Sequence, residues 1–314
     1  MNRFFFFSSV IAMLLFLLCY PKEAFQASAD GLRLWFFTVL PTLLPFLILS
    51  DALIHAGKIP AFFHHFSRFF SWSLGLSLYG TYAFALGLFC GYPMGARLTA
   101  DLLKEKKIDR READYLLTFA NNASPMFLSS YILVQTLDMR QMAVPTFIIL
   151  YLSTFLTSLL FRCLFHRFHV TSTAADSAIS EQAQPLPERL IDYSIMNGFE
   201  TITRLGGYII LFSIAAAMVH TFFHSLPVIS WLLPGIMEIT TGIHLIGLST
   251  MPAMQKYVII LTLTTFGGVS SIAQTKGMLN GTPLSIKTYI LGKTVQTVIT
   301  LSICLLFFHI QIIQ

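Results

Sequence analysis

The chain has 314 residues, of which 55% are hydrophobic and 11% are charged, and its formal net charge is +5. A soluble globular domain carries about 25% charged residues, so this composition excludes a soluble fold that covers its core with polar surface. The basic residues lie in gaps between apolar runs rather than in a stripe with aromatic partners, which argues against nucleic-acid binding.

Apolar segments recur along the whole chain. A helix needs about 20 apolar residues to cross the hydrocarbon core of a bilayer. Segments of this kind are expected at 4–20, 34–54, 76–98, 115–137, 142–165, 204–223, 228–248, 256–275 and 287–310. The sequence therefore predicts an all-α, polytopic membrane helix bundle with about nine membrane segments, several of them interrupted by Pro or Gly.

The first segment has features of a signal peptide, because Arg3 precedes the apolar run and the small residues Ala27-Ser28-Ala29 follow it. We favour an uncleaved anchor over cleavage at this point. Residues 1–30 are thus expected to form an N-terminal membrane anchor and an amphipathic lead-in to the next segment.

Orientation follows from the basic loop between Lys104 and Arg111, which holds five basic residues and is expected to be cytoplasmic. If every segment crosses once, the C-terminus and the polar linker 170–198 are also cytoplasmic, and the N-terminus lies outside. A re-entrant segment would change this count. The Ser-, Ala- and Pro-rich linker divides a first unit, 31–169, from a second, 199–314.

The two units resemble each other. Residues 116–125 and 263–271 each run from apolar residues through Thr-Phe into small and polar residues. One segment earlier, each unit has a Gly/Pro interruption, at Gly91–Gly95 and at Pro234-Gly235. Paired interruptions are typical of a transporter binding site. Chance similarity of short membrane segments is the alternative to an internal repeat.

The interruption Gly91-Tyr92-Pro93-Met94-Gly95 is expected to free backbone amides and carbonyls at membrane depth, and such groups must line a cavity or be buried. The half-helix that begins near Pro93 would present a partial positive charge to an anion, with Arg97 as counter-ion. The alternative is that the glycines allow close packing and Arg97 extends toward the cytoplasm.

Adjacent amides mark the next interruption. Ser124 is a suitable N-cap and Pro125 a suitable first helical residue, so Asn121 and Asn122 would lie at a helix break. We favour a ligand site there over simple hydrogen bonding between helices.

Glu238 is the acidic residue most deeply embedded in an apolar segment, and such a group is costly in a bilayer. It is expected to be the ion-coupling residue, the alternative being a structural pair with His244 or Arg204. The second unit contributes further site candidates, Gly267, Gly268, Ser270, Ser271 and Gln274.

Signatures of catalysis and of cofactors are weak. Gly292-Lys293-Thr294 resembles the end of a phosphate-binding loop, but position 287 is Lys rather than the required Gly. The spacing of Cys163, His166 and His169 fits a metal less well than an interfacial position. No nucleophile elbow or HExxH pair occurs in the sequence, so we expect no enzyme, no cofactor and no metal site.

Several motifs together carry a family resemblance that extends from about residue 20 to 300. They are Tyr20-Pro21-Lys22-Glu23, Leu40–Phe46, Gly91–Leu98, Ser124–Phe127, Pro234–Gly242 and Phe266–Gln274. With these motifs the chain resembles the YlbJ-like sporulation integral membrane proteins of stage V sporulation, within the nucleoside recognition or gate domain group. The linker is short for this group.

The resemblance implies two gate-like repeats and a role in sporulation, with dipicolinate moved across the outer forespore membrane. We therefore expect a multi-pass transporter or channel in the cell membrane for a small anionic aromatic solute, coupled to a proton or sodium ion. A homo-oligomer is compatible with this expectation. The alternatives are a nucleoside-like solute carrier and a non-transporting scaffold for spore envelope assembly.

Overall fold

A computed structural model describes residues 3–55, 61–164, 187–223, 225–226 and 228–313. Every regular element within these ranges is a helix, which confirms the all-α class. Residues 165–186, which hold His166, His169 and most of the predicted linker, lie outside the described residues. Helix α9 begins at Pro187, inside the range 170–198 that was assigned to the linker.

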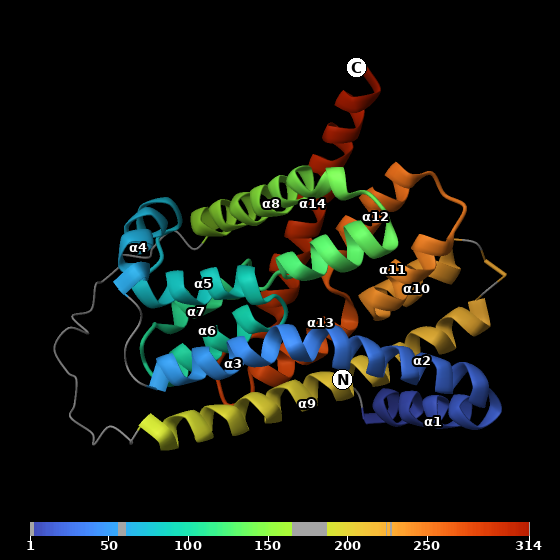
Figure 1. Ribbon diagram of the computed structural model, residues 1–314, viewed down its shortest axis with the longest axis horizontal. Coiled ribbons are helices and arrows are strands. Elements are labelled where there is room, and N and C mark those ends of the chain that lie inside the picture. The colour runs from blue at the N-terminus through green and yellow to red at the C-terminus, as the bar shows by residue number, and fades with distance from the viewer. Residues whose placement is uncertain (1–2, 56–60, 165–186, 224, 227, 314) are drawn as a thin grey trace.

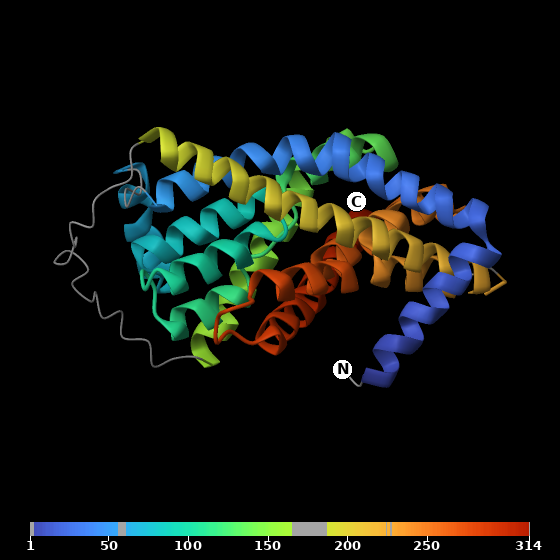
Figure 2. The ribbon, with the colours of Figure 1, turned by 90° about the horizontal axis from the view of Figure 1, so that it is seen from below.

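Two long helical elements run side by side along one edge of the molecule (Figures 1 and 2). The first joins α2 (Pro21–Leu34), a π-helical segment (Trp35–Val39) and α3 (Leu40–His55), and the second is α9 (Pro187–Phe223). They are antiparallel, because Gly31 approaches Ser213 whereas Asp51 accepts from Asn197. The unit boundary expected at residue 30 therefore falls inside a continuous helical element.

Helix α1 (Arg3–Cys19) precedes this element and meets it at a bend of 109°. Phe16 and Tyr20 pack against Phe222 near the end of α9. Helix α4 (Ala61–Leu74) meets the following helix at a bend of 94°.

Helices α5 (Leu78–Cys90) and α6 (Met94–Lys104) form a hairpin around Gly91-Tyr92-Pro93. A Cβ atom on Gly87 would lie 2.9 Å from the Cα of Gly95, whereas an unbroken helix would hold these residues about 12 Å apart. The predicted interruption is therefore present, and the chain reverses there instead of crossing straight through.

A second hairpin is formed by α10 (Ile229–Met237) and α11 (Ile239–Leu248), whose glycines Gly235 and Gly242 touch. The expected interruption at Pro234-Gly235 is wrong, since both residues lie inside α10. The break is at Glu238, whose backbone is extended. Its carboxylate accepts from the Thr241 amide, and this N-cap allows a new helix to begin at that residue.

Each hairpin is followed by an interrupted segment. Helix α7 (Arg110–Leu117) ends before an irregular stretch, and a π-helical segment (Phe127–Thr136) follows. Helix α12 (Ala253–Phe266) is separated from α13 (Gly268–Met278) by Gly267, in left-handed backbone geometry with φ of 84°. A side chain would be strained at that φ, which explains the Gly-Gly pair.

A long helix closes each series: α8 (Ala143–Leu164), preceded by a short 3₁₀ turn (Arg140–Met142), and α14 (Ile286–Ile313). The order of long helix, hairpin, interrupted segment and long helix thus occurs before and after the predicted linker. That the two series are repeats of one gate-like unit stays a prediction.

Four helical stretches are long and apolar enough to cross a membrane, and six if each bent pair counts as one span. The multi-pass membrane location is therefore supported, and the number of crossings within the about nine predicted segments stays a prediction. The predicted segments 76–98 and 228–248 are the two hairpins, and their arms of 9–13 residues are shorter than the about 20 residues that a crossing needs.

Candidate functional site

The two hairpin turns and the two interrupted segments meet in the middle of the molecule. In the first half, Gly91 lies so close to the backbone of Ser124 that a Cβ atom on it would be 2.8 Å from the Ser124 amide nitrogen. In the second half, a Cβ atom on Gly268 would lie 3.1 Å from the carbonyl oxygen of Ile236, so this glycine also lies close to the backbone of the hairpin turn. The halves join where Tyr92 lies against Gly267 and its hydroxyl donates to the carbonyl of Thr264.

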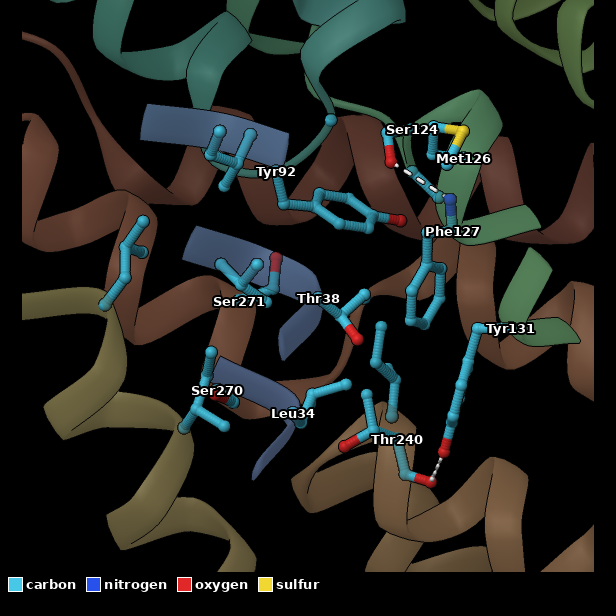
Figure 3. A pocket seen from close by; sticks show the side chains of 18 of the residues that line it. Leu34, Thr38, Tyr92, Ser124, Met126, Phe127, Tyr131, Thr240, Ser270 and Ser271 are labelled. Carbon is cyan, nitrogen blue, oxygen red and sulfur yellow. Dashed lines mark hydrogen bonds between the residues drawn. The ribbon is translucent and has the colours of Figure 1, made fainter. Parts of the chain in front are cut away.

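These four interruptions surround a cavity of about 240 Å³ (Figure 3). Hydroxyl groups, four aromatic rings, two glutamine amides and one carboxylate line it. Its wall includes Thr38, Phe37, Tyr92, Ser124, Phe127, Ser130, Tyr131, Gln135, Leu205, Glu238, Thr240, Ser270, Ser271 and Gln274. The π-helical segment of the first long element and α9 thus close the side that the hairpins leave open.

Seven of the residues expected from sequence line this cavity: Gly91, Ser124, Glu238, Gly267, Ser270, Ser271 and Gln274. Six others do not line it: Pro93, Gly95, Arg97, Asn121, Asn122 and Gly268. Gly95 packs against the backbone of Ala120 and Gly268 against the second hairpin, so both allow close approach of helices. Whether the lining residues bind a solute stays a prediction.

Ser124 and Glu238 cap the helices that leave the cavity. The Ser124 hydroxyl accepts from the Phe127 amide at 3.2 Å, the N-cap that the sequence predicted. Glu238 is 3% exposed, and one oxygen of its carboxylate accepts from the Thr240 hydroxyl and from the amide and hydroxyl of Thr241. Its suggested structural partner Arg204 pairs instead with Glu200.

The α13 side of the cavity is held by a buried hydrogen-bond network. Ser271 bonds the Tyr289 hydroxyl at 2.9 Å, and Asn121 donates its amide to Tyr289 and to Thr275. Gln274 donates to Ser270 at 3.0 Å. Asn121 thus supports the wall from behind and does not face the solute space.

Arg97 lies in a second, charged cavity of about 360 Å³ between α3, α6, α9 and α13. Its guanidinium is 3.3 Å from the Asp101 carboxylate and 3.7 Å from that of Asp51, and it donates to the Thr201 hydroxyl. Only 11% of this side chain is exposed. The guanidinium therefore joins three helices, whereas the sequence had suggested a counter-ion for solute or a solvent-directed side chain.

Sequence reasoning missed Lys293, which is 1% exposed in the second turn of α14. Its ammonium donates to the Gln296 side-chain oxygen at 3.0 Å and lies 5.1 Å from the centroid of the Tyr92 ring. The available signal was a lysine inside an apolar segment, a position that is functional by default in a membrane. Lys293 was considered only as part of the Gly292-Lys293-Thr294 motif, which does not complete a phosphate-binding loop.

Across the described ranges, no group of three or more His, Cys, Asp or Glu side chains is arranged to hold a metal ion. The arrangement offers an aromatic-walled pocket with many neutral donors and acceptors, one buried acid in the wall and one buried cation behind it. Such a pocket can orient a small ring-containing solute.

Comparison with known proteins finds one relative by sequence. The chain is 27% identical to the sporulation integral membrane protein YlbJ of Bacillus subtilis (strain 168), over 89% of this chain and 76% of the relative. The resemblance to the YlbJ-like proteins is therefore confirmed. Because 89% of the chain cannot fit into one half, the similarity to YlbJ extends over both series of helices.

No family model matches the chain, and no solved structure matches it either. The architecture described above consequently rests on the structure of this chain alone.

Proposed function

We propose that this chain is a sporulation membrane transporter or channel for a small aromatic carboxylate, with dipicolinate as the first candidate solute. The observation that carries the proposal is the meeting of four interrupted helical segments around one cavity. Irregular backbone at membrane depth is tolerated where it lines a water-filled space or is buried in protein, and transporters place their solute sites at such breaks.

The lining suits a flat ring with polar substituents. Phe37, Tyr92, Phe127 and Tyr131 provide aromatic surface, and Figure 3 shows the latter three around the same space as Ser124, Thr38 and Ser271. The volume of about 240 Å³ lies just below the about 300–1,000 Å³ of ordinary small-molecule sites. This favours a compact solute.

Coupling would use Glu238, the buried acid of the wall. An ionisable group at this depth is costly and is therefore a functional candidate by default. The sporulation role and the outer forespore membrane are inferred from the family, in which the relative is named a sporulation integral membrane protein. Transport of this kind needs no enzymatic step.

The test is uptake by purified protein in liposomes, with labelled dipicolinate and a labelled nucleoside as separate solutes. Ser130→Trp would fill the cavity and is expected to reduce uptake at least tenfold. Ser302→Trp is the matched control, because Ser302 also bonds the carbonyl four residues earlier but lies exposed on α14. Nucleoside uptake without dipicolinate uptake would favour the nucleoside carrier, and uptake of neither solute would contradict transport.

A further inference from the structure

Tyr92 separates the main cavity from a smaller void. Tyr92 and Ala123 line both the 240 Å³ cavity and a void of about 10 Å³ whose wall also includes Asn122, Thr154 and Gln296. Lys293 lines neither space, but its ammonium donates to Gln296 in the wall of the void and lies 5.1 Å from the centre of the Tyr92 ring. One aromatic side chain therefore stands between a buried cation and the solute space.

The surroundings of Lys293 are built to hold an ammonium group. Gln296 donates both of its side-chain hydrogens, at 2.8 Å each, to the Asn122 side-chain oxygen and to the Thr154 hydroxyl. Its own oxygen is thereby turned to Lys293, 3.0 Å away. The amide orientation is thus fixed by two neighbours, and Asn122 acts on the cation through Gln296.

No carboxylate among the described residues forms an ion pair with Lys293. One neutral oxygen and one aromatic face compensate a full charge only in part, because an ammonium in a low-dielectric interior needs an opposite charge. An anion that reached this nitrogen would supply it.

We propose that Lys293 is the carboxylate-binding residue of the solute site and that Tyr92 is the movable cover over it. This inference rests on the proposed transport function and names its substrate class, a ring bearing a carboxylate. The ring of Tyr92 swings aside, one solute carboxylate replaces it beside the ammonium, and the solute ring remains among the aromatic side chains of the cavity.

The experiment compares dipicolinate with its neutral analogue pyridine-2,6-dimethanol, both labelled, in proteoliposomes. Lys293→Met keeps the length of the side chain without its charge and is expected to lower dipicolinate uptake at least tenfold while leaving uptake of the neutral analogue within about twofold. Lys256→Met is the matched control. Lys256 lies near the start of α12, outside the cavity lining, and bonds the Gly247 carbonyl of α11. Uptake of both solutes should therefore stay at the wild-type level.

Tyr92→Phe provides a second variant that keeps the ring and removes the bond to the Thr264 carbonyl. A cover without this tether should open more often and raise the rate of dipicolinate uptake at least twofold. Equal loss of both solutes in Lys293→Met, or undiminished dipicolinate uptake, would overturn the inference while leaving transport itself standing. Wild-type protein that moves neither solute would overturn both.

Discussion

The ring of Tyr92 lies 5.1 Å from the Lys293 ammonium, and its hydroxyl bonds the carbonyl of Thr264. A side chain from the turn of the first hairpin thus touches both α14 and α12 in the second half. The two halves are therefore joined at the wall of the cavity by groups that one side-chain rotation would separate.

The first hairpin packs closely against the interruption after α7. A Cβ on Gly95 would lie 2.6 Å from the carbonyl carbon of Ala120, a distance that ordinary contacts do not reach. Gly95→Ala should therefore destabilise the protein by about 1–3 kcal/mol, as overpacking does. Thermal unfolding of purified protein in detergent measures this.

Gly207 provides the control, since a Cβ there would meet nothing within 4 Å. It lies inside α9, so Gly207→Ala should be stabilising by up to about 1 kcal/mol through helix propensity. Equal melting temperatures for Gly95→Ala and wild type would contradict the packing described for the hairpin.

Arg97 is expected to act on stability because it joins α3, α6 and α9. Arg97→Ala would leave Asp51, 7% exposed, without its nearby guanidinium, and loss of one partner of a buried pair costs about 3–5 kcal/mol. Asp51→Asn in the same chain should restore much of the loss. A double-mutant cycle measured by thermal unfolding checks this coupling.

If Arg97 contacted the solute instead, Arg97→Ala would lower uptake with little change in melting temperature, and Asp51→Asn would not compensate. That outcome would return Arg97 to the role first suggested by its sequence position.

The carboxylate of Glu238 is expected to couple transport to an ion gradient. Glu238→Gln retains an oxygen that can accept from the Thr241 amide, so the N-cap of α11 and the fold should survive. Accumulation of solute driven by a proton or sodium gradient should fall at least tenfold, whereas exchange of labelled for unlabelled solute should continue. Accumulation at the wild-type level in Glu238→Gln would remove this residue from coupling.

Glu112, beside the basic loop and outside the membrane segments, gives a pH prediction. Burial raises the pKa of its carboxyl above the ordinary value, and the hydrogen bond from the Ser77 amide offsets this only in part. On raising the pH, the unfolded chain releases this proton first and the folded protein later. Wild-type stability should therefore decline between the two pKa values and carry a constant penalty above them.

Glu112→Gln keeps an oxygen for the Ser77 amide and cannot ionise. Its melting temperature relative to wild type should rise as the pH is raised from about 4.5 through the raised pKa, and then level off. A difference that stays constant or falls over this range would show that ionisation of Glu112 does not oppose folding.

Local chemistry explains which parts of the site could be predicted from sequence. Gly91, Ser124-Pro125 and Gly267 mark interruptions because only glycine tolerates the backbone at Gly91 and Gly267, and because Ser and Pro begin helices. The break at Glu238 was misplaced at Pro234, since a proline within a short helix does not always end it. The position of this break depends on the Glu238 carboxylate, which caps the helix that follows.

The roles of Arg97 and Lys293 depend on contacts between helices, which the sequence does not show. The sequence suggested that Arg97 lies near a helix break, but it could not indicate that Asp51 and Thr201 come from other helices to hold it. The surroundings of Lys293 could not be predicted because Tyr92, which lies beside its ammonium, and Asn122, which orients its partner Gln296, come from other elements than α14. Each hairpin was predicted as one interrupted membrane segment, because hydropathy gives no direction to a short apolar helix.

The central claim is that the helix breaks share a cavity that water and solute reach from outside the protein. Labelling of Ser124→Cys with a charged thiol reagent, in a chain whose four native cysteines are replaced by serine, tests it most directly. Ser153→Cys is the control, because Ser153 is fully buried in α8 and lies outside the cavity lining. The account predicts that Ser124→Cys reacts, that dipicolinate slows the reaction and that Ser153→Cys stays unlabelled; failure of Ser124→Cys to react in folded protein would contradict it.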